Sequence, residues 1–447
     1  MSTQAGTTPE VQTTGLRRAI SGKLLFLFIL GDVLGAGIYA LVGVLAGEVG
    51  GALWVPFVVA LVLATLTATS YAELVTKYPK AGGAAVFAQR AFQRPVVSFL
   101  VGFSMLAAGV TSVAGLALAF SGDYLGALVD VPALPAALVF LTLVALLNMR
   151  GIKDSLRANV AMTVIEVGGL LLIVALAAVV LGRGDGDPGR TLEFAPGQSA
   201  VTGILAASVL AFYSFVGFET SANVAEEAVD PSRTYPRALF GGLAVAGVVY
   251  VLVGLAVSTA VAPEQIASSS GPLLEVVRVA DVGLPGWLYS LIALIAVANG
   301  ALLTAIMCSR LTYGMAVEGL LPRVLGRVLP NRRTPWVAIV VTTLVSMALV
   351  ATGDLADLAA TVVLLLLFVF IATNVAVLVL RRDDVAHRHY RAPTVLPVLG
   401  VLACVALLTQ QEAGVWLRAA ILLAVGAVLY AVTRRAVPAE QRARSGR

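Results

Sequence analysis

The stretch GDVLGAGIYAL, residues 31–41, lies inside an apolar run near the N-terminus and carries three glycines and one aspartate. Glycine lowers the stability of a helix interior by roughly 1 kcal/mol relative to alanine, so this cluster predicts a break. A second apolar run carries FYSFVGFET at residues 212–220. Freed backbone groups are tolerated at membrane depth only where they line a cavity or lie buried in protein. Two such breaks predict a substrate site between them; the simpler alternative is that the glycines permit close helix packing.

The composition indicates that lipid is the solvent for most of this chain. Apolar residues make up 59% of it, charged residues 12%, and the mean hydropathy is +0.95. A soluble domain is about a quarter charged, so we expect a polytopic membrane protein. Cys308 and Cys404 lie in apolar runs without metal-ligand or disulfide spacing, and we expect no metal and no cofactor. The polar N-terminal tail leads into a run too long for a signal-peptide core, so no cleaved leader is expected.

Twelve apolar runs are long enough to cross about 30 Å of hydrocarbon, which takes roughly 20 residues each. With a cytoplasmic N-terminus, the inner connections hold 26 of the 30 Lys and Arg residues, as the positive-inside rule requires. The net charge of +5 is then explained by the basic residues of the inner connections and does not indicate nucleic-acid binding. Both termini are expected in the cytoplasm, and the source is expected to be a bacterium. The expected spans are 24–46, 51–75, 96–120, 133–149, 158–181, 200–225, 237–260, 286–312, 336–352, 355–380, 394–410 and 415–433.

Three motifs follow one another from the first span to the sixth. They are GAGIY at 35–39, YPKAGGAAVFAQRAF at 78–92 and FVGFETSANVAEEAVDPSRTYPRAL at 215–239. Together they resemble the amino acid, polyamine and organocation permease superfamily, and within it the bacterial branch similar to cationic amino acid transporters. The resemblance implies an all-α fold of twelve transmembrane helices: a five-plus-five inverted repeat with broken helices 1 and 6, and two added C-terminal helices.

This plan divides the chain into one transmembrane domain and two tails. The expected domain covers 24–433, between cytoplasmic tails at 1–23 and 434–447. Repeat one is expected over about 24–181, repeat two over about 200–380, and the added helices over about 394–433. An odd number of spans in each half, here five, would invert the second half relative to the first, as an inverted-topology repeat requires. The connections at 183–197, 226–239 and 320–336 are expected to be loops, with at most short helices in the last two.

The expected substrate site uses backbone groups at both breaks. Free N–H groups at Gly35, Ala36, Gly37 and Ile38 lie at the positive end of a half-helix, where a carboxylate is favoured. Carbonyls at Ser214, Phe215 and Val216 lie at the negative end of another half-helix, where they can accept from an ammonium group. The resemblance places the substrate at these positions. It also implies an aromatic gate at Tyr213, with Phe218 as a second gate candidate; simple packing is the alternative.

Three carboxylates within the spans are candidates for coupling transport to an ion, because ionisable groups at membrane depth are costly. Glu219 follows the second break and could instead cap free N–H groups there. Asp32 precedes the first break and could merely bond to nearby backbone. Glu166 lies about where some relatives carry a lysine, so a lysine mechanism cannot be transferred; it could carry a proton or be structural. Asn299 could complete a cation site or only link helices, and Glu73 is expected to pair with Lys77 at the inner surface.

These features favour a secondary active amino acid permease, with small-molecule substrate and lipid as its partners. Protons are the expected coupling ion for symport or exchange, and Na⁺ is the alternative. A polyamine or other organic cation is the main rival substrate, since it would depend on the acidic side chains and not on the N–H groups of the first break. A channel or transporter-like sensor is a remote alternative. An enzyme is not expected, because no histidine lies at membrane depth and no Cys/His spacing suits catalysis.

Overall fold

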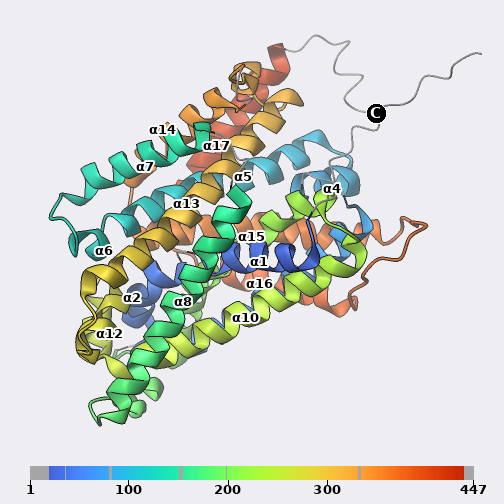
Figure 1. Cartoon of the computed structure of the whole chain (residues 1–447). Helices are drawn as coiled ribbons and strands as arrows, with labels where there is room; N and C mark the ends of the chain where they lie inside the picture. Colours follow the sequence, from blue (N-terminus) through green and yellow to red (C-terminus); the bar gives the residue numbers. More distant parts are fainter. Residues whose placement is uncertain are drawn as a thin grey trace, which may run out of the picture.

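The computed structural model describes residues 20–35, 37–79, 83–150, 155–197, 199–330 and 334–436. Within these residues the chain forms helices alone, with one isolated bridge between Ile20 and Ala228 (Figure 1). The elements are α1 (Gly22–Val33), α2 (Gly37–Val49), α3 (Trp54–Lys77), α4 (Gly83–Phe92), α5 (Pro95–Phe120), α6 (Asp123–Gly126), α7 (Ala133–Arg150), α8 (Ser155–Gly182), η1 (Pro188–Leu192), α9 (Ala200–Ser214), η2 (Phe218–Glu227), α10 (Pro231–Ala260), α11 (Pro263–Ala267), α12 (Pro272–Ala280), α13 (Gly286–Val317), η3 (Arg323–Gly326), α14 (Trp336–Val350), α15 (Leu355–Leu380), α16 (Val395–Leu408) and α17 (Ala413–Ala436).

Twelve apolar segments account for the membrane plan that the sequence predicts. Within the described residues, ten segments are long and apolar enough to span a bilayer, and two shorter apolar helices, α14 and α16, complete the series. The spans at Gly22–Val49 and Ala200–Asn223 each contain one of the two breaks. The all-α, polytopic fold with broken first and sixth segments is therefore confirmed.

One connection differs from its predicted form. The segment 226–239 was expected to be a loop, but α10 begins at Pro231 and continues through Pro236 into the seventh span. Proline is well placed at the first position of a helix, because the N–H that it lacks has no helical partner there. The polar residues from Pro231 onward therefore form the first turns of a 30-residue helix.

Short helices follow the second and the seventh spans, five spans apart. Trp54 at the start of α3 donates from Nε1 to the carbonyl of Thr191, so α3 runs from the end of the bundle that holds the 183–197 connection to the opposite end at Lys77. α4 follows α3 at that Lys77 end. The end of α10 lies beside the 183–197 connection, because Asp187 donates its N–H to the Thr259 carbonyl, and α11 and α12 follow there. The second and seventh spans thus run in opposite directions, as an inverted repeat requires. The boundaries of the two repeats stay a prediction.

A buried ion pair lies at the Lys77 end of the bundle, and the partner of Glu73 in it is not the expected one. Glu73 is 2% exposed and pairs in two-pronged fashion with Arg381, at 2.7 and 2.9 Å. The expected partner, Lys77, instead donates from Nζ to the carbonyl of Leu380 at 2.6 Å. The planar guanidinium matches both carboxylate oxygens, whereas an ammonium suits the free carbonyls at the end of α15. Burial and the hydrogen bond to Asp383 raise the pKa of nearby Tyr78 to about 12, so its phenol stays a donor.

Candidate substrate site

The first break separates α1 from α2. α1 ends at Val33, where the N–H of Leu34 still bonds to the carbonyl of Leu30, and α2 begins at Gly37. The first N–H groups of a helix have no partner inside it, so the start of α2 presents free donors and the positive end of a helix dipole. Ala36, one of the expected carboxylate-binding residues, lies outside the described residues.

The second break separates α9 from η2 and depends on one glycine. α9 ends at Ser214, and Gly217 then takes φ = +128°, a backbone conformation that side chains other than glycine rarely adopt. The N–H of Gly217 donates to Oε2 of Glu219 at 2.9 Å. The capping alternative for Glu219 therefore describes its observed contact: the carboxylate occupies the positive end of η2.

The two breaks pack against each other so closely that glycine is required on both sides. A Cβ on Gly37 would lie 2.8 Å from Cα of Ser214, and a Cβ on Gly217 would lie 2.7 Å from the carbonyl oxygen of Asp32. Real Cβ atoms essentially never approach other atoms this closely. The glycines thus serve the helix breaks and also the close packing that was the alternative explanation for them.

A cavity of about 60 Å³ lies where the two breaks meet. A space of roughly 10–15 Å³ can hold one water, so this cavity has room for several waters or a small ligand. Its wall comes from α1, α2, α5, α9, η2, α13 and α15, together with the residues at the two breaks. The lining residues are Asp32, Val33, Gly35, Gly37, Met105, Ala108, Gly109, Ser112, Leu116, Tyr213, Ser214, Val216, Gly217, Glu219, Thr220, Gly300, Thr304, Met307, Val362 and Leu366.

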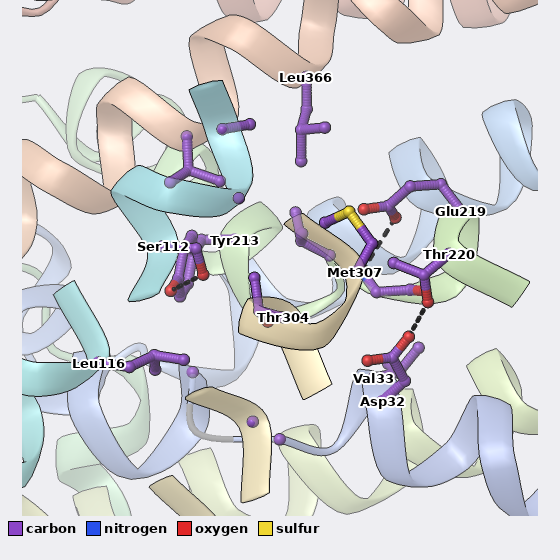
Figure 2. A pocket seen from close by; sticks show the side chains of 18 of the residues that line it. Asp32, Val33, Ser112, Leu116, Tyr213, Glu219, Thr220, Thr304, Met307 and Leu366 are labelled. Carbon is purple, nitrogen blue, oxygen red and sulfur yellow. Dashed lines mark hydrogen bonds between the residues drawn. The ribbon is translucent and has the colours of Figure 1, made fainter. Parts of the chain in front are cut away.

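The two ends of the cavity differ in chemistry. Figure 2 shows Asp32, Glu219 and Thr220 gathered on one side, Ser112 and Tyr213 on the other, with the α13 residues Thr304 and Met307 between them. Thr220 donates its hydroxyl to Asp32, and the Tyr213 and Ser112 hydroxyls are bonded at 2.9 Å. Among the described residues that line the cavity, Asp32 and Glu219 are the charged ones, and neither Lys nor Arg occurs.

The structure brings most of the expected site residues together around this cavity and leaves others outside it. Those in the lining are Asp32, Gly35, Gly37, Tyr213, Ser214, Val216 and Glu219. Ile38 is fully buried and is not part of the lining. Phe215 packs against Tyr250, Phe218 stacks on Phe370 at 5.5 Å, and neither residue is among those that line the cavity.

Glu166 is buried in a separate polar contact between α8 and α13. Asn299 donates from Nδ2 to Oε1 of Glu166 at 3.0 Å, while Oε2 has no partner among the described residues. The Tyr39 phenol of α2 donates to the backbone carbonyl of Glu166 at 2.8 Å. The hydrogen bond from Tyr39 ties α8 to α2, the half-helix that begins at the first break. Glu166 itself does not line the cavity.

Several lining residues have no distinguishing sequence signal. Thr220 stands next to Glu219 and could have been found from its place after the break. Ser112, Met307 and Leu366 lie within long apolar helices, where neighbouring residues of the same types face lipid or the core. Among the described residues, no group of three His, Cys, Asp or Glu side chains is placed to hold a metal ion.

Comparison with known proteins gives matches over nearly the whole chain. The family model described as amino acid permease matches residues 20–431. An uncharacterized transporter of Mycobacterium tuberculosis is 32% identical, over 94% of this chain and 92% of the relative. A branched-chain amino acid permease of Bacillus subtilis is 28% identical, over 93% and 92% of the two chains. A methylthioribose transporter of the same bacterium is 26% identical, over 94% of each.

Proposed function

Because the chain belongs to the amino acid permease family, we propose that it is a secondary active permease that moves an amino acid across a bacterial cytoplasmic membrane by alternating access. The observation that carries this proposal is the cavity between the two helix breaks. Its lining includes Gly37 at the start of α2 and Val33 and Ser214 at the ends of α1 and α9, and the dipoles of these helix ends have opposite signs. A zwitterion needs both kinds of group.

The substrate's carboxylate is assigned to the start of α2. Gly37 lines the cavity, and the N–H groups of the first turn are free by helix geometry. The other positive helix end, at η2, is already occupied by Glu219. The ammonium group is assigned to the ends of α1 and α9, where Val33 and Ser214 line the cavity and helix dipoles are negative.

Protons are the proposed coupling ion, and Glu166 is the first candidate to carry them. Its Oε2 is buried without a partner, and a protonated carboxyl relieves that cost more readily than a charged one. Asp32 and Glu219 are the other candidates, but each is already engaged, by Thr220 and by the Gly217 N–H. Na⁺ would also suit carboxylate oxygens and is the alternative coupling ion.

A polyamine or other organic cation is the second candidate substrate, and the charge of the cavity favours it. Asp32 and Glu219 give the lining two acidic groups, and the part of the chain that the structure describes adds no Lys or Arg to balance them. A polyamine would bind these carboxylates and ignore the start of α2. The two candidates therefore differ in whether a ligand carboxylate is required.

The proposed orientation places the Lys77 end of the bundle and both termini in the cytoplasm. Lys77, Arg90 and Arg381 lie in or beside the contacts at this end. Few basic residues occur in the connections at the other end, as the positive-inside rule describes for an outer face. The division into two inverted repeats and two added helices belongs to the same proposal.

The testing experiment uses purified protein, first in thermal-shift screens and then in liposomes. The screen contains the standard amino acids, polyamines and methylthioribose, which lacks both a carboxylate and an ammonium group. Ligands that stabilise the protein are then followed as labelled uptake under an imposed proton or sodium gradient. Stabilisation and gradient-driven accumulation of an amino acid support the proposal. Stabilisation by polyamines alone moves the assignment to organic cations, and flux without saturation or counterflow would indicate a channel.

A further inference from the structure

Tyr250 of α10 lies behind the two broken helices and not in the cavity. Its side chain is fully buried, with its ring centroid 5.5 Å from that of Phe57 and 5.1 Å from that of Phe215. It is absent from the residues that line the cavity. Position and burial alone would make it a packing residue of the seventh span.

The phenol oxygen of Tyr250 meets the ends of both broken helices. It lies 2.5 Å from the carbonyl oxygen of Val33 and 2.9 Å from that of Ser214. Val33 is the last residue of α1 and Ser214 is the last residue of α9. Both carbonyls belong to the groups that a helix end leaves without an intrahelical partner. One hydroxyl thus ties together the two half-helices that precede the breaks.

The hydroxyl cannot satisfy both carbonyls at once. A phenol has one hydrogen to donate, so at any moment one of the two carbonyls lacks this bond. A buried carbonyl without a donor is costly. An ammonium group brings three donors, and Val33 and Ser214 both line the cavity that it would enter.

We propose that Tyr250 is a positioning residue, whose hydroxyl holds the ends of α1 and α9 together so that the Val33 and Ser214 carbonyls converge on the ammonium group of the substrate. This inference rests on the proposed amino acid site and adds the residue that shapes its ammonium end. The negative dipole ends of α1 and α9 meet at the same point, and Asp32 lies next to Val33. Tyr250 touches no substrate in this arrangement and acts through the two carbonyls.

The test compares Tyr250→Phe with Tyr124→Phe. Tyr124 is a matched control, because it is also fully buried, donates to one backbone carbonyl (that of Tyr39, at 2.9 Å) and does not line the cavity. The ligands are the amino acid that binds best in the screen and its desamino analogue, which keeps the carboxylate and side chain. Dissociation constants are measured on purified full-length protein, and the readout is the ratio of the two constants.

We expect Tyr250→Phe to weaken amino acid binding roughly 5- to 10-fold, the size of one lost hydrogen bond, and to change desamino binding less than twofold. Tyr124→Phe should leave the ratio at its wild-type value. An unchanged ratio in Tyr250→Phe overturns the inference, since a purely structural role would weaken both ligands alike. A wild-type protein that binds no amino acid, or binds both ligands equally, instead contradicts the proposed function on which the inference rests.

A second substitution covers the case in which Tyr250→Phe does not fold. Replacing Tyr250 by 3-fluorotyrosine keeps the ring and the hydroxyl but makes the phenol a stronger donor. The ratio of dissociation constants should then shift by more than twofold, while the same replacement at Tyr124 leaves it unchanged. A ratio that stays at the wild-type value in both proteins contradicts the positioning role.

Discussion

Asn299 holds one oxygen of Glu166 and leaves the other free: its Nδ2 donates to Oε1 at 3.0 Å, and Oε2 is buried without a partner among the described residues. This contact joins α13 to α8 beside the helix that carries the first break. A carboxylate with one satisfied oxygen can gain or lose a proton while the Asn299 bond stays in place. The pair therefore offers a way to change charge inside the bundle without taking the helices apart.

The first prediction concerns Glu166→Gln. The amide oxygen of Gln still accepts from Asn299, but the side chain carries no exchangeable acid. We expect the dissociation constant of the substrate to stay within about threefold of wild type. Net accumulation driven by a proton gradient should be lost, so that only exchange of substrate across the membrane remains. The measurement is uptake in liposomes with an imposed gradient. Asn148→Ala, which removes an amide that bonds to Ser309 elsewhere on α13, is the control and should keep gradient-driven uptake. Wild-type accumulation in Glu166→Gln would make this glutamate structural.

The second prediction concerns the approach of the two breaks. In Gly37→Ala the new Cβ would lie 2.8 Å from Cα of Ser214, which is backbone and cannot rotate away. The breaks must separate, so we expect substrate-induced stabilisation in a thermal-shift assay to be lost. Gly168→Ala is the matched control: it is a helical glycine with nothing within 4 Å of its Cβ position, and alanine should stabilise α8 there by up to about 1 kcal/mol. Normal substrate binding by Gly37→Ala would place the site elsewhere.

The third prediction separates a buried ion pair from an exposed one at the Lys77 end. Arg381→Met leaves Glu73 buried without its guanidinium, and breaking such a pair costs roughly 3–5 kcal/mol. We expect a large drop in melting temperature with little change in substrate affinity, because the pair does not line the cavity. Arg90→Met, which breaks a pair with Asp383 in which both side chains are more than 40% exposed, should cost less than about 1 kcal/mol. Equal melting temperatures for the two variants would contradict this difference.

The fold could be predicted from the sequence because membrane spans follow from apolar length and the breaks follow from glycine. The cavity end at Asp32, Gly37, Ser214 and Glu219 could be predicted for the same reason, since these residues stand at the breaks. The direction in which each side chain points could not be predicted from the sequence. Phe218 follows the break directly, yet its ring is fully buried and stacks on that of Phe370.

Partners distant in sequence were equally out of reach. Glu73 was expected to pair with its near neighbour Lys77 and instead pairs with Arg381, which follows α15. Helical periodicity reports which residues share a face of one helix, but it does not report which helix lies opposite. Ser112 and Tyr250 were missed for this reason, since their roles depend on α9 and α1 as neighbours.

The last prediction decides between two roles for Glu219. Its Oε2 accepts from the N–H of Gly217, where the φ of +128° turns the chain. In Glu219→Gln the amide oxygen can accept the same bond, so we expect binding and proton-driven accumulation to persist. In Glu219→Ala the Gly217 N–H loses its partner, a buried cost of about 1–3 kcal/mol, and the break should loosen enough to weaken substrate binding. Uptake and thermal shift on both variants distinguish the roles. Loss of accumulation in Glu219→Gln, with binding intact, would instead make Glu219 the proton carrier, because charge and not capping would then be the property that transport requires.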